Sequence, residues 1–331
     1  MAIPGDLYLS VDFGSSPTKD DGTRPYTGTN PQWNSASIWL DGGPNQTQTR
    51  VGTPTTIKVR VSNKGKSPVT AVRVDAYVMN PFVGISQPQQ AMDGLVLSGF
   101  AGSIGPGSGA ASGTDAHVVT CMFQDPAQGP IPWTPTDAQL NGTINGDGHL
   151  CLIANVFADG DGHQLVPVEN FEVVSDQHQG QRNITLLPMT KLKSGDLEFL
   201  IMPAPFEGMD TRVAFEVVDP KVAIGAGERW LLLSHPDISE CHGKDGLVLN
   251  LKGKKVPLFL SDTEPKAELY IDEIEQTGGG VLPPFPEPLR ARVKVDMGEQ
   301  KLGAMHVFDV VQRDPKEQVL GALRFVTVLT G

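Results

Sequence analysis

The sequence predicts an all-β protein made of two tandem sandwich domains with long loops. Apolar residues recur at every second position in several short runs, which is the period of a strand with one buried face. These runs are interrupted by 37 Gly and 27 Pro in a chain of 331 residues, so turns are frequent. No extended run combines the composition and the 3.6-residue period of a long helix, and we therefore expect few helices.

The clearest strand signal lies in two neighbouring runs of the first half. In the first run, Ile57, Val59 and Val61 alternate with polar residues, and a second alternating run covers residues 72–78. The segment between them, residues 63–66, reads Asn-Lys-Gly-Lys and is rich in turn formers. We predict that the two runs form an antiparallel hairpin.

Four further runs complete the predicted first domain. The run at residues 6–13 lies close to the N-terminus and is expected to form an edge strand. Residues 14–36 contain almost no aliphatic side chains and are predicted to form a long loop, in which Asp20-Asp21-Gly22 is either a solvated turn or a cation or partner site. The other strands are expected at residues 117–123, 150–157 and 183–187.

Three segments of the first half carry a family resemblance. They are the pattern Trp33-x-Ser35-x-x-Ile38-Trp39-Leu40 with the strand ending Val59-Arg60-Val61-x-Asn63-x-Gly65, the run from Asp147 to Ala154, and Gln181-Arg182-Asn183-Ile184. On these residues, roughly the first 190 positions resemble CARDB-like immunoglobulin-type domains of bacterial secreted proteins, although Ser35-Ala36-Ser37 replaces the family's usual Ser-Pro-Asp. The resemblance implies an exported module that accompanies peptidase or adhesive domains.

The predicted boundary between the domains is Pro188, which gives domains at 1–188 and 189–331. Nine short strand-like runs follow it, and this number suits a second immunoglobulin-like sandwich. They cover residues 197–202, 212–218, 229–234, 247–251, 256–260, 267–274, 289–295, 306–312 and 322–329. Residues 283–288 read Pro-Pro-Phe-Pro-Glu-Pro, a stiff loop whose spacing matches a polyproline ligand, a signal too common to carry weight alone.

The net charge of −12 is shared by both halves, and the chain lacks the basic stripe of a nucleic-acid or anionic-membrane binder. No run of apolar residues is long enough to span a membrane. The N-terminus does not read as a signal peptide. The resemblance indicates an extracellular or cell-surface protein, while the N-terminal sequence keeps a cytoplasmic location as the alternative.

Three cysteines cannot all pair within one chain. Cys121 and Cys151 lie in apolar runs and are expected to be buried thiols, with a disulfide between neighbouring strands as the alternative. Cys241 precedes His242 in a turn-rich segment, but no further ligands accompany the pair at metal-binding spacing.

Two features of the first half are candidate binding sites. Trp133 stands in a proline-rich loop, where it is either a platform for a sugar or a partner, or a side chain folded into the core. Asp159, Asp161 and His163 begin like a calcium loop, but the pattern fails at three of its positions. Asp-Gly turns at the ends of one strand explain the same residues, so no cofactor is expected and calcium is the alternative.

The chain shows no complete catalytic motif and is expected not to be an enzyme. The alternative is an unrecognised metal-dependent hydrolase. In that case His117, with Asp115 beside it, would meet His149 and His163 at one end of the first sandwich.

The expected function is structural or adhesive, as a subunit or ancillary module of a larger surface or extracellular assembly. The expected partners are other protein subunits, in a homo-oligomer or a filament formed through strand edges. A carbohydrate- or calcium-binding module is the alternative. The residues expected to form the assembly edges are Leu7, Leu9, Val11, Phe325, Val326 and Val328.

Overall fold

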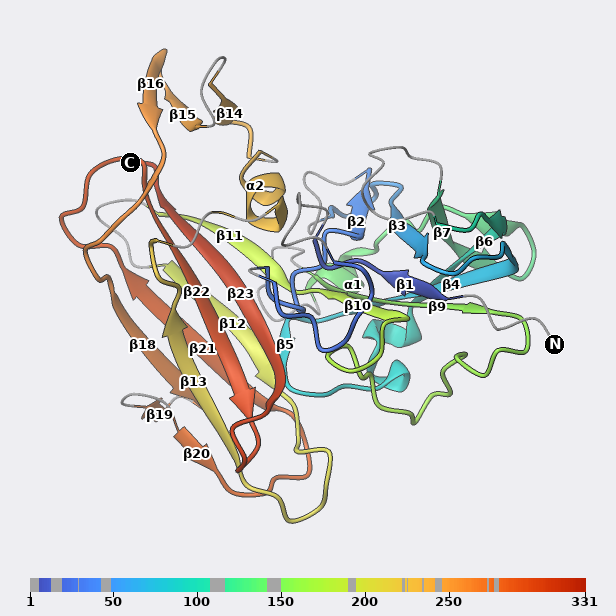
Figure 1. The fold of residues 1–331 in the computed structure, drawn as a ribbon. Helices are drawn as coiled ribbons and strands as arrows, with labels where there is room; N and C mark the ends of the chain where they lie inside the picture. Colours follow the sequence, from blue (N-terminus) through green and yellow to red (C-terminus); the bar gives the residue numbers. More distant parts are fainter. Residues whose placement is uncertain are drawn as a thin grey trace. The chain divides into compact units, whose positions relative to one another are not determined.

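Strands form most of the regular structure, and the prediction of an all-β protein is confirmed (Figure 1). The computed structural model describes residues 6–12, 20–28, 30–42, 49–107, 117–141, 150–189, 195–221, 224, 226–233, 235–241, 246–272, 274–276 and 280–331. No helix in these ranges is long and apolar enough to cross a membrane. The chain divides into two compact units. The first unit contains residues 1–80, 86–183 and 225–227, and the second contains residues 81–85, 184–224 and 228–331.

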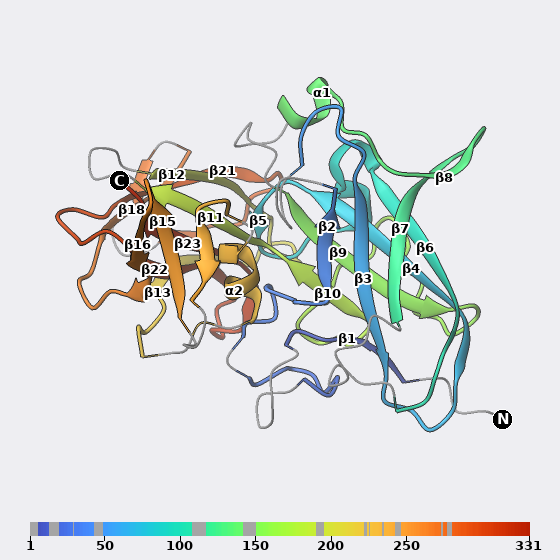
Figure 2. The ribbon, with the colours of Figure 1, turned by 90° about the horizontal axis from the view of Figure 1, so that it is seen from above.

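One nine-stranded sheet makes up the first unit (Figure 2). Its strands are β1 (Leu7–Leu9), β2 (Ile38–Asp41), β3 (Thr56–Asn63), β4 (Val69–Met79), β6 (Val96–Ile104), β7 (Val118–Asp125), β8 (Gly129–Ile131), β9 (Cys151–Ala158) and β10 (Gln179–Arg182). They pair in the order β1-β3-β7-β6-β4-β9-β10, with β2 beside β3 and β8 beside β7. The connections contain two 3₁₀ turns, η1 (Pro88–Gln90) and η2 (Met92–Gly94), and the short helix α1 (Asp137–Asn141).

This sheet folds over itself at β7. Residues 118–121 of β7 pair with β3, whereas residues 122–125 pair with β6 and β8. The two layers therefore share one core, in which Val59 of β3 and Val74 of β4 are both fully buried. The far ends of the sheet meet where the Ser35 amide donates a 2.8 Å hydrogen bond to the Gln181 carbonyl.

The predicted hairpin at residues 57–78 is wrong, although both of its strands exist. β3 pairs with β1, β2 and β7, whereas β4 pairs with β6 and β9. Between the two strands, the Oδ1 atom of Asn63 accepts a 2.9 Å hydrogen bond from the Gly65 amide. Alternation records only that each strand has one buried face. Two strands in opposite layers around one core carry the same pattern as a hairpin.

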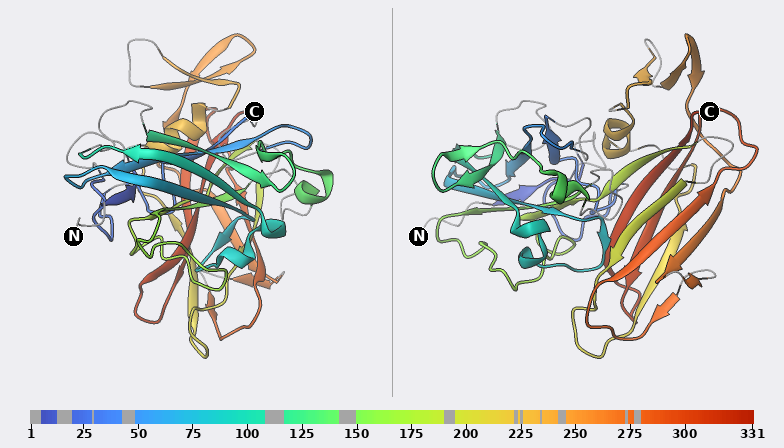
Figure 3. Two further views of the ribbon diagram at one scale, coloured as in Figure 1. Left: turned by 90° about the vertical axis from the view of Figure 1, so that its right-hand side faces the viewer. Right: turned by 180° about the vertical axis from the view of Figure 1, so that it is seen from behind.

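Two sheets that face each other form the second unit (Figure 3). One contains β5 (Phe82–Val83), β12 (Gly195–Ile201), β18 (Lys266–Ile271), β19 (Ile274–Gln276) and β21 (Leu289–Asp296), in the order β19-β18-β21-β12-β5. The other contains β11 (Ile184–Met189), β13 (Thr211–Val217), β17 (Phe259–Leu260), β20 (Gly280–Leu282), β22 (Ala304–Arg313) and β23 (Val319–Leu329), in the order β11-β23-β22-β13-β20 with β17 beside β22. Phe199 of β12 shares a core with Phe308 and Phe325 of the opposite sheet, whose rings lie 4.9 Å apart.

The central strands of the second unit follow the immunoglobulin order. In that fold, strands B, E and D pair in one sheet and strands C, F and G pair in the other. Here β12, β21 and β18 take the places of B, E and D, and β13, β22 and β23 take those of C, F and G. The pairing therefore agrees with the predicted immunoglobulin-like second sandwich.

A third layer covers the outer face of β22 and β23. It consists of helix α2 (Ala226–Leu233) and a small sheet of β14 (Ile238–Glu240), β15 (Leu247–Leu251) and β16 (Lys254–Pro257). Leu231 and Leu232 of the helix pack in one cluster with Val326 and Val328 of β23. Because both of its faces are covered, β23 reads as an almost continuous apolar run.

The strand predicted at residues 229–234 is wrong, because helix α2 occupies this segment. A short apolar run does not distinguish a strand from a buried helix, and the run there is one helical turn long. Glu228 of α2 and Asp309 of β22 both contact the buried guanidinium of Arg324. This ionic network links the third layer to the sandwich.

The domain boundary predicted at Pro188 lies a few residues too late. β11 already belongs to the second unit, where it pairs in parallel with β23. In addition, β5 from the first half of the sequence pairs in parallel with β12 of the second unit. The chain therefore passes between the units at 80/81, 85/86 and 183/184, and again around residues 225–227.

Candidate functional site

The strand predicted to offer the C-terminal assembly edge is not an edge. β23 lies between β22 and β11, so both sides of its backbone are paired. Phe325, Val326 and Val328 are fully buried. Their apolar character reflects two covered faces and not a free surface for another subunit.

The N-terminal strand β1 does lie at the end of its sheet, but its outer side is blocked. Leu7, Leu9 and Val11 are buried. The Leu9 amide donates a 2.9 Å hydrogen bond to the Gln177 carbonyl, and the Leu9 carbonyl accepts a 2.6 Å hydrogen bond from Arg24. The prediction that these residues form an open assembly edge is therefore wrong, because the chain itself satisfies the edge groups.

Asp20, from the predicted turn at residues 20–22, is part of the same blocking structure. Its side chain accepts hydrogen bonds from the amides of Val11 at 2.7 Å and Gly22 at 2.8 Å, and it pairs with Arg24 at 2.9 Å. The residue is 1% exposed. Asp20 is therefore a buried residue whose hydrogen bonds hold the loop in place. Its carboxylate is neither solvated nor available as a ligand.

Trp133 is a core residue, as the second of its two interpretations predicted, and the interpretation as an exposed binding platform is wrong. Its side chain is 4% exposed and packs in the core of the first unit. The Trp133 amide donates a 2.9 Å hydrogen bond to the Thr55 carbonyl, and the Trp133 carbonyl accepts a 2.7 Å hydrogen bond from the Thr55 amide. The indole Nε1 donates a 3.3 Å hydrogen bond to Gln139, which satisfies its polar edge.

The carboxylates of the predicted calcium loop are used within the protein. Asp159 forms an ion pair with Arg73 at 2.7 Å. The two oxygens of Asp161 accept hydrogen bonds from the amides of Ala158 and His163, at 2.6 and 2.9 Å. Gly160 adopts a φ of +80° in the turn between them. This is the Asp-Gly turn that the sequence favoured over a calcium loop.

His163 lies in a different cluster, with Asp176 and His178. The rings of His163 and His178 stack with their centroids 3.7 Å apart, and the Nδ1 atom of His178 lies 2.8 Å from the Oδ1 atom of Asp176. One potential ligand atom of each residue lies within 4.8 Å of the other two. Burial tends to raise the pKa of Asp176, but hydrogen bonds and charge from His178, with a smaller effect of His163, lower it overall.

The predicted strands did not reveal this cluster. His163 follows the strand predicted at residues 150–157, but β10, which follows Asp176 and His178, was not among the predicted runs, and the next of these runs, at residues 183–187, is β11 of the second unit. Because β9 and β10 are consecutive antiparallel strands, the turns after β9 and before β10 lie together. The pairing of Asn155 with Gln179 shows this register. Of the other residues proposed for a hydrolase site, Asp115 and His149 lie outside the described residues.

Cys121 and Cys151 are buried free thiols, as the first of the two interpretations predicted. Burial raises the pKa of both thiols above its ordinary value, so they stay protonated and unreactive at neutral pH. Cys241 is a partly buried free thiol, and His242 lies outside the described residues.

Three loops of the second unit lie at the same end of its sandwich. The register pairs Ile201 with Leu289 and Arg212 with Arg313, which brings together the loops at residues 202–210, 283–288 and 314–318. In immunoglobulin terms the first joins B to C and the last joins F to G. These are loops that carry recognition in variable domains. We call this the loop end of the second unit.

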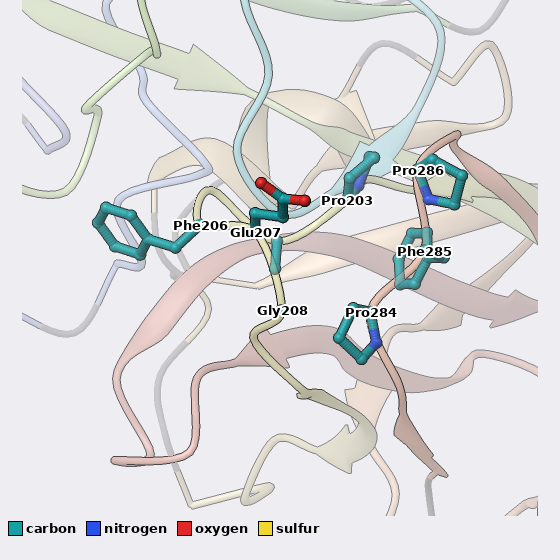
Figure 4. A pocket seen from close by; sticks show the side chains of 8 residues that line it. Pro203, Phe206, Glu207, Gly208, Pro284, Phe285 and Pro286 are labelled. Carbon is teal, nitrogen blue, oxygen red and sulfur yellow. The ribbon is translucent and has the colours of Figure 1, made fainter.

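A hollow of about 400 Å³ lies at the loop end (Figure 4). It is lined by Pro203, Ala204, Phe206, Glu207, Gly208, Pro284, Phe285 and Pro286. In Figure 4, Phe206 projects away from the proline side, with Glu207 between them. Phe206 is 71% exposed. The sequence identified residues 283–288 as a stiff loop but gave no sign that residues 203–208 lie beside it, because these segments are far apart in the chain.

No family model matches this chain, and no curated protein matches it. Among solved structures, it is similar to a partial N-terminal region of the enterococcal surface protein, with 10% identity and a TM-score of 0.21 over 98% of this chain and 100% of that one. The adhesive subunit CfaE of the CFA/I fimbria of enterotoxigenic Escherichia coli shows 7% identity and a TM-score of 0.17, over 99% and 94%. The collagen adhesin of S. aureus shows 8% identity and a TM-score of 0.18, over 88% and 91%. At these scores the fold assignment depends on the strand pairing described above.

Proposed function

We propose that this protein is a non-catalytic structural or adhesive β-sandwich protein that binds another protein through the loop end of its second unit. The observation that carries the proposal is the hollow there, which exposes the ring of Phe206 on one side and is lined by Phe285 and three prolines. Loops on a rigid sandwich are a common place for recognition. Aromatic side chains are enriched in protein interfaces, where a few buried anchors carry most of the binding energy.

The lining favours an extended, proline- or aromatic-containing segment as the occupant. Pro203, Pro284 and Pro286 stand with Phe206 and Phe285 around the hollow. Grooves lined by aromatic side chains accept extended segments whose conformation is already fixed, because little entropy is lost on binding.

The charge of the loop end favours basic residues in that segment. Its three loops contain five acidic residues and one basic residue, and Glu207 lines the hollow itself. The acidic residues are Glu207, Asp210, Glu287, Asp314 and Glu317, and the basic one is Lys316. Opposite charges around an apolar contact increase the association rate and select the partner.

The proposal also includes the location of the protein and its assembly with other subunits. The sequence pattern from Trp33 to Gly65 supports a CARDB-like first unit and, with it, a role as a subunit of a larger assembly at the cell surface. In this proposal assembly uses the loop end, because the two terminal strands are paired or blocked. A sugar-binding role through Trp133 is not retained, since the indole lies in the core.

A displayed library of random short peptides tests the proposal. The full chain is immobilised, and bound peptides are selected and sequenced. We expect enrichment of peptides that combine proline or aromatic residues with Arg or Lys. Phe206→Ala should weaken their binding by roughly tenfold or more, as for an interface aromatic.

Phe100→Ala is the matched control, because Phe100 is similarly exposed at 64% but belongs to the first unit. It should leave binding unchanged. Selection of no peptides, or of peptides that bind the Phe206→Ala protein equally well, would overturn the proposal.

A further inference from the structure

We infer that His163, Asp176 and His178 form a binding site for a divalent transition metal, with Zn²⁺ as the best match. This site lies in the first unit and is independent of the loop end. The potential ligand atoms of these three side chains lie within 4.8 Å of one another.

Both sides of the cluster are held by the surrounding backbone. The His163 carbonyl accepts a 2.8 Å hydrogen bond from Asn155 of β9, and the His163 amide donates to Asp161 at 2.9 Å. On the other side, the His178 carbonyl accepts a 2.9 Å hydrogen bond from the amide of Val156. The two turns are thereby fixed to the same strand, which limits the entropy lost when a metal binds.

Asp176 orients the second histidine. Its Oδ1 atom accepts hydrogen bonds from the backbone amide and the Nδ1 atom of His178, at 2.9 and 2.8 Å. Its Oδ2 atom accepts a 3.2 Å hydrogen bond from Gln179. A metal ion can take the place of the proton between Nδ1 of His178 and Oδ1 of Asp176, so that both atoms become ligands.

The His163 nitrogen must move closer to the other two ligand atoms when a metal binds, whereas Nδ1 of His178 and Oδ1 of Asp176 are already 2.8 Å apart. Zinc bonds to nitrogen are about 2.0–2.1 Å long, so ligand atoms around tetrahedral zinc lie roughly 3.3 Å apart. His163 lies in a turn and is partly exposed, which leaves its ring room to rotate from its stacked position. His178 is buried and keeps its place.

The donor set selects the class of metal. Two imidazole nitrogens and one carboxylate oxygen suit Zn²⁺, Cu²⁺ or Ni²⁺. Ca²⁺ prefers six to eight oxygen ligands, and the nearby carboxylates of Asp159 and Asp161 are occupied by Arg73 and backbone amides. The site therefore differs from the calcium loop that the sequence suggested, although His163 belongs to both.

Isothermal titration calorimetry of the full chain, freed of any affinity tag and treated with chelator, tests the inference. We expect about one Zn²⁺ to bind per chain at this site, and no heat with Ca²⁺. His163→Ala should weaken Zn²⁺ binding on the order of 10- to 100-fold. Because His163 is partly exposed, this variant should keep the wild-type circular dichroism spectrum.

His235→Ala is the matched control, since this partly exposed histidine lies in the second unit. The visible spectrum of bound Co²⁺ provides a second measurement, because a tetrahedral site gives a strong absorption that His163→Ala should abolish. Absence of Zn²⁺ binding to the wild-type chain, or equal binding by the folded His163→Ala protein, would overturn the inference.

Discussion

His306 is a buried histidine on β22, where its Nε2 atom lies 2.9 Å from the Oε1 atom of Gln300. Its ring also stacks near that of Phe308, with the centroids 5.8 Å apart. Burial disfavours the charged imidazolium and lowers the pKa of His306 from 6.5 to about 4. The residue is therefore neutral in the folded protein over a pH range in which the unfolded chain takes up a proton.

We predict that this histidine makes the second unit sensitive to acid. Above pH 6.5 neither state is protonated at His306, and its contribution to stability is fully present. As the pH falls from about 6.5 towards 4, protons bind only to the unfolded chain, and the free energy of unfolding decreases by up to about 3 kcal/mol. Urea unfolding at several pH values measures this decrease.

His306→Gln should flatten that part of the pH profile, because glutamine keeps a hydrogen-bond donor but does not titrate. His235→Gln, at a partly exposed loop position, should keep the wild-type slope. Equal slopes in all three proteins would contradict the assignment to His306.

At the scale of single residues, the sequence predicted burial better than it predicted contacts. Cys121 and Cys151 were predicted from their apolar neighbours, and both are buried thiols. The partner of His163 could not be predicted in the same way. The metal-loop pattern placed it with Asp159 and Asp161, whereas the pairing of β9 with β10 places it beside His178. Periodicity reports the environment of a side chain, and strand pairing decides its neighbours.

At the scale of elements, most strands of the second half were predicted correctly within a few residues. The wrong predictions concern either which strands pair or whether a short run forms a strand or a helix. β3 and β4 face one core from opposite layers, and α2 has the apolar run of a short strand. Both failures have the same physical origin, because burial of one face is required in either arrangement.

The position of β5 depends on close approach between two backbones. A Cβ atom on Gly321 of β23 would lie 2.1 Å from the carbonyl oxygen of Gly84, directly after β5. We predict that Gly321→Ala lowers the free energy of unfolding of the second unit by about 1–3 kcal/mol, because a backbone must shift to accommodate the methyl group.

Chemical denaturation monitored by circular dichroism measures this change. Gly246→Ala is the control, since a Cβ atom there meets nothing within 4 Å. If Gly321→Ala and Gly246→Ala had the same unfolding midpoint, the close packing of β5 against β23 would not contribute to stability.

At the scale of the whole molecule, two sandwich-like units were predicted and the structure contains two compact units. The boundary between the units was harder to predict from the sequence, because β11 follows the first unit without a proline- or glycine-rich linker. β11 also pairs with the last strand of the chain, β23, across a separation of more than a hundred residues. Such long-range pairing leaves no local signal at the boundary.

We predict that a fragment starting at residue 184 is more stable than one starting at the predicted boundary, residue 189. The longer fragment keeps the parallel pairing of β11 with β23, whereas the shorter one exposes that side of β23. An exposed strand edge promotes association between chains. The shorter fragment should therefore unfold at a lower urea concentration and elute as larger species in size-exclusion chromatography.

Both fragments lack β5, so the comparison isolates the contribution of β11. Identical midpoints and identical elution volumes would show that β11 is dispensable for the second unit.

The origin of β5 in the first half of the sequence has a consequence for synthesis on the ribosome. Residues 81–85 leave the exit tunnel more than a hundred residues ahead of β12, their partner. The strands of the nascent first unit can pair with one another while residues 81–85, which lie between them in the sequence, still have no partner strand. The second unit is complete only when β12 has been made and β5 can pair with it. The speed of translation through residues 86–201 therefore sets how long the unpaired β5 segment can associate with a neighbouring nascent chain.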